Sequence, residues 1–265
     1  MDPSPLRSLI GRLWPWPCFR PREISAHRWS VTLESYPFLG WRSPEEVSEL
    51  RRMCSAFLAA KEFSGARGFV VTDQVALAVA AQACLPVLRL GLQCYEGFVG
   101  IVMHEGPVLA QREVVDEAGI VHTWEESLVG ESVAGGPVML SWCEGVAAGS
   151  ADQGTAFNVV IHEFVHILDG LDGAMDGIPA LSAQKRGQWK QLLGQCFDRF
   201  NERSVCGYES VIDDYAAQDP IEFYAVTSEA FFTRPRRFRD EQPELYEIYR
   251  DFYRQDPASW QPPDD

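Results

Sequence analysis

The stretch Asn158–Gly173, NVVIHEFVHILDGLDG, constrains the fold more than any other part of the sequence. Most of its residues are apolar, which predicts a buried helix. The polar exceptions are not scattered, because four of them fall on one helical stripe: Asn158, His162, His166 and Asp169. Burying a polar side chain without a partner costs free energy, so this stripe needs a partner inside the fold.

A metal ion is the partner that fits this stripe best. The pattern His162-Glu163-x-x-His166 places two imidazoles one helical turn apart, with Glu163 beside them to act on water. The alternative is a pair of core histidines satisfied by backbone groups or by Asp169. Two of the chain's five histidines share this one stripe of an apolar helix, which favours the metal site.

The helix cannot complete such a site alone. Zinc at a catalytic site takes three protein ligands and leaves one position for water. No histidine follows His166, so the extended pattern H-E-x-x-H-x-x-G-x-x-H is absent, and His27, His104 and His122 all precede the motif. We therefore expect the third ligand to be a glutamate on a later helix, where several candidates exist.

Composition limits the partners and the location. The 265 residues contain 23 Lys and Arg against 38 Asp and Glu, a net charge of −15, which argues against nucleic acid and against anionic membranes. The seven cysteines include no C-x-x-C pair and indicate reduced thiols. No signal peptide or membrane span is recognisable in the sequence. We expect a cytoplasmic protein.

Local patterns predict an α+β fold in which a small mixed sheet packs beside helices. Ser43-Pro44-Glu45-Glu46 is a capping box with proline at the first helical position. Helices are expected over residues 44–61, 72–84, 182–203, 219–233 and 243–254. Strands are expected over residues 98–104, 112–115, 120–124 and 136–142, with a hairpin turn at 116–119. The metal-site helix then lies at the junction of sheet and helices.

Four separated segments carry a family resemblance: QACLPVLRLGLQCYEGF, GPVMLSW, HEFVHILDG and YAAQDPIEFYAVTSEAFF. In this order they resemble the Mlc titration factor A (MtfA) family of zinc-dependent peptidases, which is related to the catalytic domain of anthrax lethal factor. The resemblance covers about residues 35–255 and implies a single zincin-like domain holding one Zn²⁺. Residues 1–34 are expected to be a loosely ordered N-terminal leader, and residues 256–265 an acidic, proline-containing tail.

The resemblance also selects site residues. It implies that Glu222 is the third zinc ligand and that Tyr215, seven residues earlier, is catalytic. The residues alone leave alternatives, since Glu222 could cap its own helix and Tyr215 could be an ordinary packing residue. Glu229, two turns further on, is either a competing ligand or a partner for a ligand histidine. Asp169 is a similar partner or merely ends its helix.

The expected activity is peptide hydrolysis, as an aminopeptidase or an endopeptidase. Zinc is held by His162, His166 and Glu222. Glu163 moves the proton, and Tyr215 donates to the oxyanion. The strand over residues 136–142 is expected to bind an extended peptide at its edge.

Two other functions remain possible from the sequence. The resemblance implies association with a glucose-regulated transcriptional repressor, so the chain could be a metal-stabilised regulatory protein that sequesters a transcription factor. A structural metal site tends to be closed by four ligands and needs no general base, so Glu163 favours the enzyme. The third possibility is a zinc hydrolase that acts on a non-peptide amide or ester.

Overall fold

The computed structural model describes residues 23–106, 108–115, 121–128, 130–132, 136–142, 158–205, 207 and 209–263. Its α-helices, in chain order, are α1 (Ala26–Ser35), α2 (Pro44–Ala60), α3 (Asp73–Cys84), α4 (Val159–Asp169), α5 (Ala183–Val205), α6 (Pro220–Thr233), α7 (Pro235–Glu241) and α8 (Pro243–Tyr253). Short 3₁₀ turns join them at η2 (Pro37–Gly40), η3 (Leu92–Tyr95), η4 (Gly170–Asp172), η5 (Asp214–Ala217) and η6 (Pro257–Ser259).

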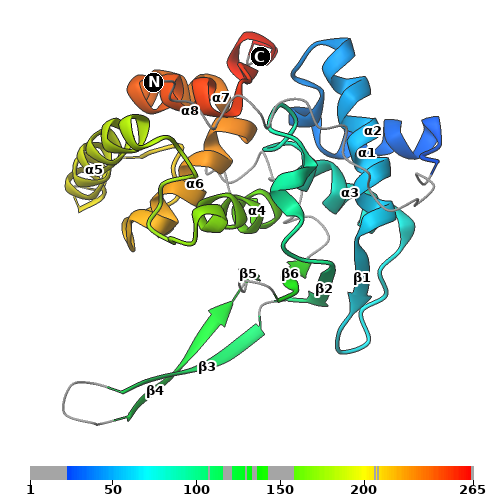
Figure 1. Ribbon diagram of the computed structural model, residues 1–265, viewed down its shortest axis with the longest axis horizontal. Helices are drawn as coiled ribbons and strands as arrows, with labels where there is room; N and C mark the ends of the chain where they lie inside the picture. The colour runs from blue at the N-terminus through cyan, green and yellow to red at the C-terminus, as the bar shows by residue number, and fades with distance from the viewer. Residues whose placement is uncertain are drawn as a thin grey trace, which may run out of the picture.

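The main sheet is mixed and has the strand order β1-β2-β6-β5. Its strands are β1 (Glu62–Gly65), β2 (Gly100–Glu105), β5 (Gly130–Ser132) and β6 (Val138–Trp142). β2 runs parallel to both β1 and β6, whereas β5 pairs antiparallel with β6. The helices gather on one side of this sheet (Figure 1). The α+β class with a small mixed sheet is therefore confirmed.

A separate antiparallel ribbon is formed by β3 (Val108–Val115) and β4 (Val121–Leu128). It extends away from the helices (Figure 1). Both strands were predicted, although each is longer than its sequence pattern indicated. The predicted turn at 116–119 lies outside the described residues.

Local capping explains why the predicted helices begin where they do. At α2, Ser43 and Glu46 form the predicted capping box, and Pro44 is the first helical residue. Thr72 caps α3 by accepting from the Val75 N–H at 3.2 Å. Helix α1 was not predicted, yet Ser25 caps it and Trp29 is buried on it. Residues 26–35 are thus helical, while residues 1–22 of the predicted leader lie outside the described residues.

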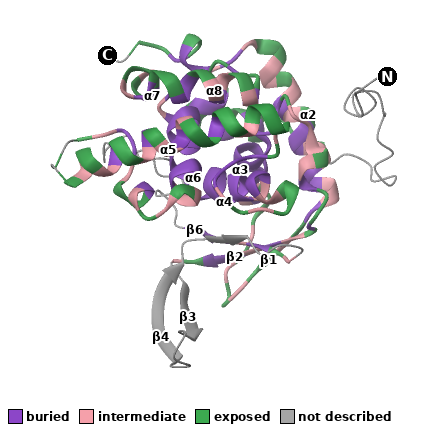
Figure 2. Ribbon diagram, turned by 60° about the vertical axis from the view of Figure 1, so that its left-hand side comes forward, coloured by how far each residue is buried: buried purple, intermediate pink, exposed green. Residues whose placement is uncertain are grey.

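Helices α3, α4 and α6 form the centre of the core (Figure 2). Phe164 on α4 is fully buried and packs its ring against Phe57, Tyr95 and Phe98, with ring centroids 5.0 to 5.8 Å apart. α4 also lies against α6 and against strands β5 and β6. A side chain on α4 is therefore held by the core on several sides, which suits a site that needs fixed geometry.

The prediction that residues 136–142 offer a free strand edge is wrong. β6 is flanked by β2 on one side, and by β5 along Val138–Leu140 on the other. Pairing partners depend on how the chain folds back, which strand periodicity does not encode. The edge of the four-stranded sheet on this side is β5.

Residues 256–261 pack on the helices. The Gln261 side chain is buried and accepts a hydrogen bond from the Arg236 N–H at 3.0 Å. The Tyr246 hydroxyl donates to Asp256 at 2.5 Å. The proposed division into leader, domain and tail remains a prediction. Among the described residues, no helix is both long and apolar enough to cross a membrane.

Candidate metal centre

Helix α4 presents both histidines of the motif on one buried face. Asn158 caps the helix, because its side-chain oxygen accepts from the Ile161 N–H at 3.0 Å. His162 and His166 follow one turn apart, each only 7% exposed, and their Nε2 atoms are 3.0 Å apart. Two imidazole nitrogens therefore meet at one point inside the core.

Glu222 reaches the same point from α6. The Asp219 carboxylate caps this helix by accepting from the N–H groups of Ile221 and Glu222, at 2.8 and 2.9 Å. The Glu222 carboxylate turns to the histidines, with Oε2 2.9 Å from His162 Nε2 and 3.6 Å from His166 Nε2. The structure therefore places Glu222, the glutamate that the resemblance selected, next to the two histidines of the motif.

These three side chains form a group able to hold a metal ion, with all ligand atoms within 4.8 Å of one another. Glu222 Oε2 is buried and, although close to both imidazoles, forms no hydrogen bond with good geometry to any described residue. Ligand atoms that converge in this way around an oxygen without a well-aligned hydrogen bond suit a shared cation. Two imidazoles and one carboxylate are also a ligand set that leaves a coordination position for water.

The carboxylates and the imidazoles of the group stabilise each other's charged forms. Burial lowers the pKa of His162, but Glu222 and Glu229 outweigh burial and raise it well above its usual value. Burial likewise raises the pKa of Glu222, but His162 and His166 outweigh it and hold the pKa at about 2. Glu222 is therefore ionised at neutral pH and available as an anionic ligand.

Glu229 lies behind His162, on the side away from Glu222. It is fully buried, and its Oε1 is 2.8 Å from His162 Nδ1, whereas Glu222 faces His162 Nε2. Burial raises the pKa of Glu229 to about 7, with His162 opposing the shift. Of the two roles left open by the sequence, this geometry matches a partner that orients the ligand histidine.

The two predicted catalytic residues lie beside the group. Glu163 is 4% exposed on α4, and its charge acts on His162. Tyr215 belongs to η5, is 45% exposed, and its ring centroid is 6.0 Å from that of His162. The structure thus brings all five predicted residues into one region, with Tyr215 at its solvent-facing rim.

Comparison with known proteins agrees with this geometry. Residues 16–254 match the family described as glucose-regulated metallo-peptidase M90. The chain belongs to this family. It is 33% identical to the Mlc titration factor A of Pectobacterium atrosepticum over 94% of this chain and 95% of that protein. The Escherichia coli protein of the same name is 32% identical, with 92% of each chain covered. That of Serratia proteamaculans is 33% identical, covering 93% and 94%.

In this M90 chain Asp169 organises a loop. Its carboxylate accepts from the N–H groups of Gly177 and Ile178, both at 2.9 Å, so among the described residues it binds backbone and no ligand histidine. Gly177 has a positive φ of 76°, and a Cβ there would lie 2.3 Å from the carbonyl oxygen of Pro220. The loop that follows α4 therefore presses on the first turn of α6, which carries Glu222.

The other histidines do not join the group where they are described. His27 is exposed on α1. His104 is buried on β2, with Nδ1 2.8 Å from the carbonyl oxygen of Gly106. The side chain of His122 lies outside the described residues.

Sequence reasoning missed one neighbour of the group. Gln82 on α3 is fully buried and accepts from Asn158 Nδ2 at 2.6 Å. The available signal was a lone glutamine in the apolar run VALAVAAQAC.

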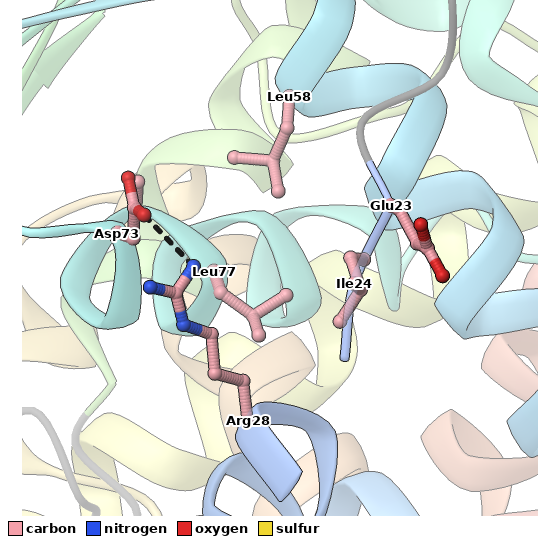
Figure 3. A pocket seen from close by; sticks show the side chains of 7 residues that line it. Glu23, Ile24, Arg28, Leu58, Asp73 and Leu77 are labelled. Carbon is pink, nitrogen blue, oxygen red and sulfur yellow. Dashed lines mark hydrogen bonds and ion pairs between the residues drawn. The ribbon is translucent and has the colours of Figure 1, made fainter. Parts of the chain in front are cut away.

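A cavity of about 250 Å³ lies elsewhere, beside α1 and α3 (Figure 3). The ion pair between Arg28 and Asp73, 2.8 Å long, forms part of its wall. It is lined by Glu23, Ile24, Arg28, Leu58, Asp73, Ala76 and Leu77. No member of the metal group lines this cavity, so it is separate from the site.

Proposed function

We propose that the chain is a zinc-dependent metallopeptidase of the gluzincin type, with a histidine pair on one helix and a glutamate on another. The observation that carries the proposal is the meeting of His162 Nε2, His166 Nε2 and Glu222 Oε2 in the core. Ligand atoms about 2.1 Å from a tetrahedral zinc are roughly 3.4 Å apart. The 2.9 to 3.6 Å separations between these three atoms are close to that value.

Zinc held by these side chains would act as a Lewis acid and bring the pKa of water towards about 7. Glu163 then accepts the proton of the attacking water and delivers it to the leaving amine. Its burial and the effect of its charge on His162 support this role. Glu163 is the feature that favours an enzyme over a purely structural metal site, which needs no general base.

Tyr215 supplies the second catalytic group. The Asp213 carboxylate accepts from the Tyr215 N–H at 2.9 Å and fixes the turn that carries the ring. The ring lies near His162 and is partly exposed, so its hydroxyl can donate to a substrate carbonyl oxygen as negative charge develops there.

Strand β5 is the edge that suits an extended substrate. β5 lies against α4 and pairs with β6 on one side only, among the described strands. An extended peptide added to this edge would gain main-chain hydrogen bonds next to the metal helix.

The test uses the full chain with measured metal content. We expect one zinc per chain, hydrolysis of a chromogenic aminoacyl or peptide substrate, loss of hydrolysis with a chelator and recovery with added zinc. Peptides with free and with blocked amino ends separate aminopeptidase from endopeptidase action. Hydrolysis that survives complete metal removal would contradict the proposal.

Regulatory binding is the second candidate function, because the relatives are named for titration of Mlc. We propose that a glucose-regulated transcriptional repressor is a partner as well as, or in place of, a peptide substrate. Repressor binding by a Glu163→Gln variant that lacks hydrolysis would show that binding stands alone. A cytoplasmic location suits both functions and the free thiols at Cys54, Cys84, Cys94 and Cys196.

A further inference from the structure

A continuous run of buried hydrogen bonds leads from α3 to His162. Gln82 and Asn158 are both at most 1% exposed, and neither belongs to the motif or to the ligand group. Asn158 Nδ2 donates to Gln82 Oε1 at 2.6 Å, and the Asn158 backbone N–H donates to Glu229 Oε2. Glu229 Oε1 then meets His162 Nδ1 at 2.8 Å.

The two amides in this run have fixed orientations. Asn158 Oδ1 accepts from the Ile161 N–H at 3.0 Å, so its Nδ2 must face Gln82. Gln82 Nε2 donates to the Ala78 carbonyl at 3.0 Å, so its oxygen must face Asn158. Turning either amide over would set donor against donor or acceptor against acceptor in a dry interior, where such mismatches are costly.

The position of Glu229 depends on the Asn158 backbone, which these two side chains hold in place. One carboxylate oxygen is held by the Asn158 N–H, which leaves the other for His162 Nδ1. A His162 ring that donates from Nδ1 keeps the Nε2 lone pair available for a metal ion shared with His166 and Glu222. Three helices, α3, α4 and α6, are thus tied together directly behind one ligand.

We propose that Gln82 and Asn158 are positioning residues of the metal centre: through Glu229 they hold His162 with Nε2 directed at Glu222. The inference rests on the proposed metal centre and assigns two residues that support it. Gln82 lies 80 residues before the first ligand, so the N-terminal part of the fold contributes to metal binding.

The experiment compares three variants of the full-length chain. Gln82→Met removes the link to Asn158 with little change in size or charge. Asn158→Ser keeps a side chain that caps α4 but loses the donor to Gln82. Gln255→Met is the matched control, because Gln255 is also buried, donates to the Leu85 carbonyl at 2.9 Å just beyond α3, and does not belong to the run.

For each variant the zinc dissociation constant is measured by competition with a chromophoric chelator, and the Co²⁺ absorption spectrum reports ligand geometry. The metal-free unfolding free energy shows whether a variant acts only through stability. We expect Gln82→Met and Asn158→Ser to weaken zinc binding roughly 10-fold or more and to alter the Co²⁺ spectrum. Gln255→Met should leave the zinc dissociation constant and the Co²⁺ spectrum unchanged, even if it lowers the unfolding free energy by the same amount.

Two outcomes would count against the inference. If the wild type binds no zinc, the metal centre fails and the inference fails with it. If the wild type binds zinc but Gln82→Met and Asn158→Ser bind as tightly as Gln255→Met, the inference alone is overturned. Asn158→Ser decides the question if Gln82→Met does not fold.

Discussion

In the proposed mechanism, Glu163 is the residue at which metal binding and hydrolysis can be separated. A Glu163→Gln substitution keeps the shape of this buried side chain and removes its ability to accept a proton. Because the three ligands remain, zinc content and unfolding temperature should match the wild type. Turnover of a peptide substrate should fall by roughly 10²- to 10⁴-fold. Glu49→Gln, at an ion pair on the surface of α2, is the control, and wild-type turnover of Glu163→Gln would exclude Glu163 as the base.

Tyr215 allows a test of oxyanion stabilisation, because Tyr215→Phe removes only the hydroxyl. The side chain is 45% exposed, so stability should change little. Loss of one oxyanion donor costs roughly 10²- to 10³-fold in kcat, with a smaller change in KM. Steady-state kinetics at constant zinc content provide the measurement. A raised KM with unchanged kcat would instead assign Tyr215 to substrate binding.

Residues of the centre differ in how far the sequence alone predicts them. His162, Glu163 and His166 follow from spacing, because one helical turn is a local relation. Glu222 required a family resemblance, since nothing local says which of the later glutamates reaches α4. Gln82 was not predicted, because its partner on α4 depends on how two helices pack.

At the scale of elements, the contact between the loop after α4 and the start of α6 should set the position of Glu222. Gly177→Ala would place a Cβ 2.3 Å from the Pro220 carbonyl oxygen at a φ of 76°. We expect a lower unfolding temperature and weaker zinc binding, because Glu222 lies two residues after Pro220. Thermal unfolding of the metal-free chain and zinc competition measure the two effects.

Gly173→Ala is the matched control for this prediction. Gly173 also has a positive φ, 86°, but a Cβ there would meet nothing within 4 Å. It should therefore show only the conformational cost, roughly 1–2 kcal/mol, and no loss of zinc affinity. Equal behaviour of the two variants would mean that the loop does not position α6.

The elements themselves were predictable where their signals are local. Caps and prolines gave the starts of α2, α3 and α6, and each is observed. β1 and β5 were not predicted because they are four and three residues long and are strands only through their pairing with β2 and β6. The prediction of a free edge at β6 was wrong for the same reason, since the order of strands in a sheet is a property of the whole chain.

At the scale of the whole molecule, one buried charge should leave a signature in the pH dependence of stability. Lys61 follows α2 directly, is 8% exposed, and donates from Nζ to the carbonyl groups of Tyr95 and Phe98. Its ammonium group also lies 3.7 Å from the centroid of the Phe98 ring. Burial lowers the pKa of Lys61 from 10.5 to about 8, although Cys84 and Glu96 oppose the shift.

The direction of the effect follows from the two pKa values. Between pH 8 and 10.5 the unfolded chain holds the Lys61 proton and the folded chain releases it, so this residue's contribution to the unfolding free energy rises with pH. At about 1.4 kcal/mol per pKa unit, the full rise is at most about 3.5 kcal/mol. Buried tyrosines with raised pKa values, such as Tyr36, act in the opposite direction and lower the unfolding free energy as the pH rises above about 10.

Comparison with Lys61→Met isolates the contribution, because the tyrosines are common to both chains. Urea unfolding at pH 7 and pH 10 should show the free energy of the wild type increasing relative to that of Lys61→Met. At neutral pH the buried ammonium group of Lys61 then lowers the unfolding free energy. Two carbonyl groups and an aromatic ring next to α2 offset part of this loss. A difference that stays constant between the two pH values would show that Lys61 keeps its ordinary pKa, and that its ammonium group is solvated in the folded chain.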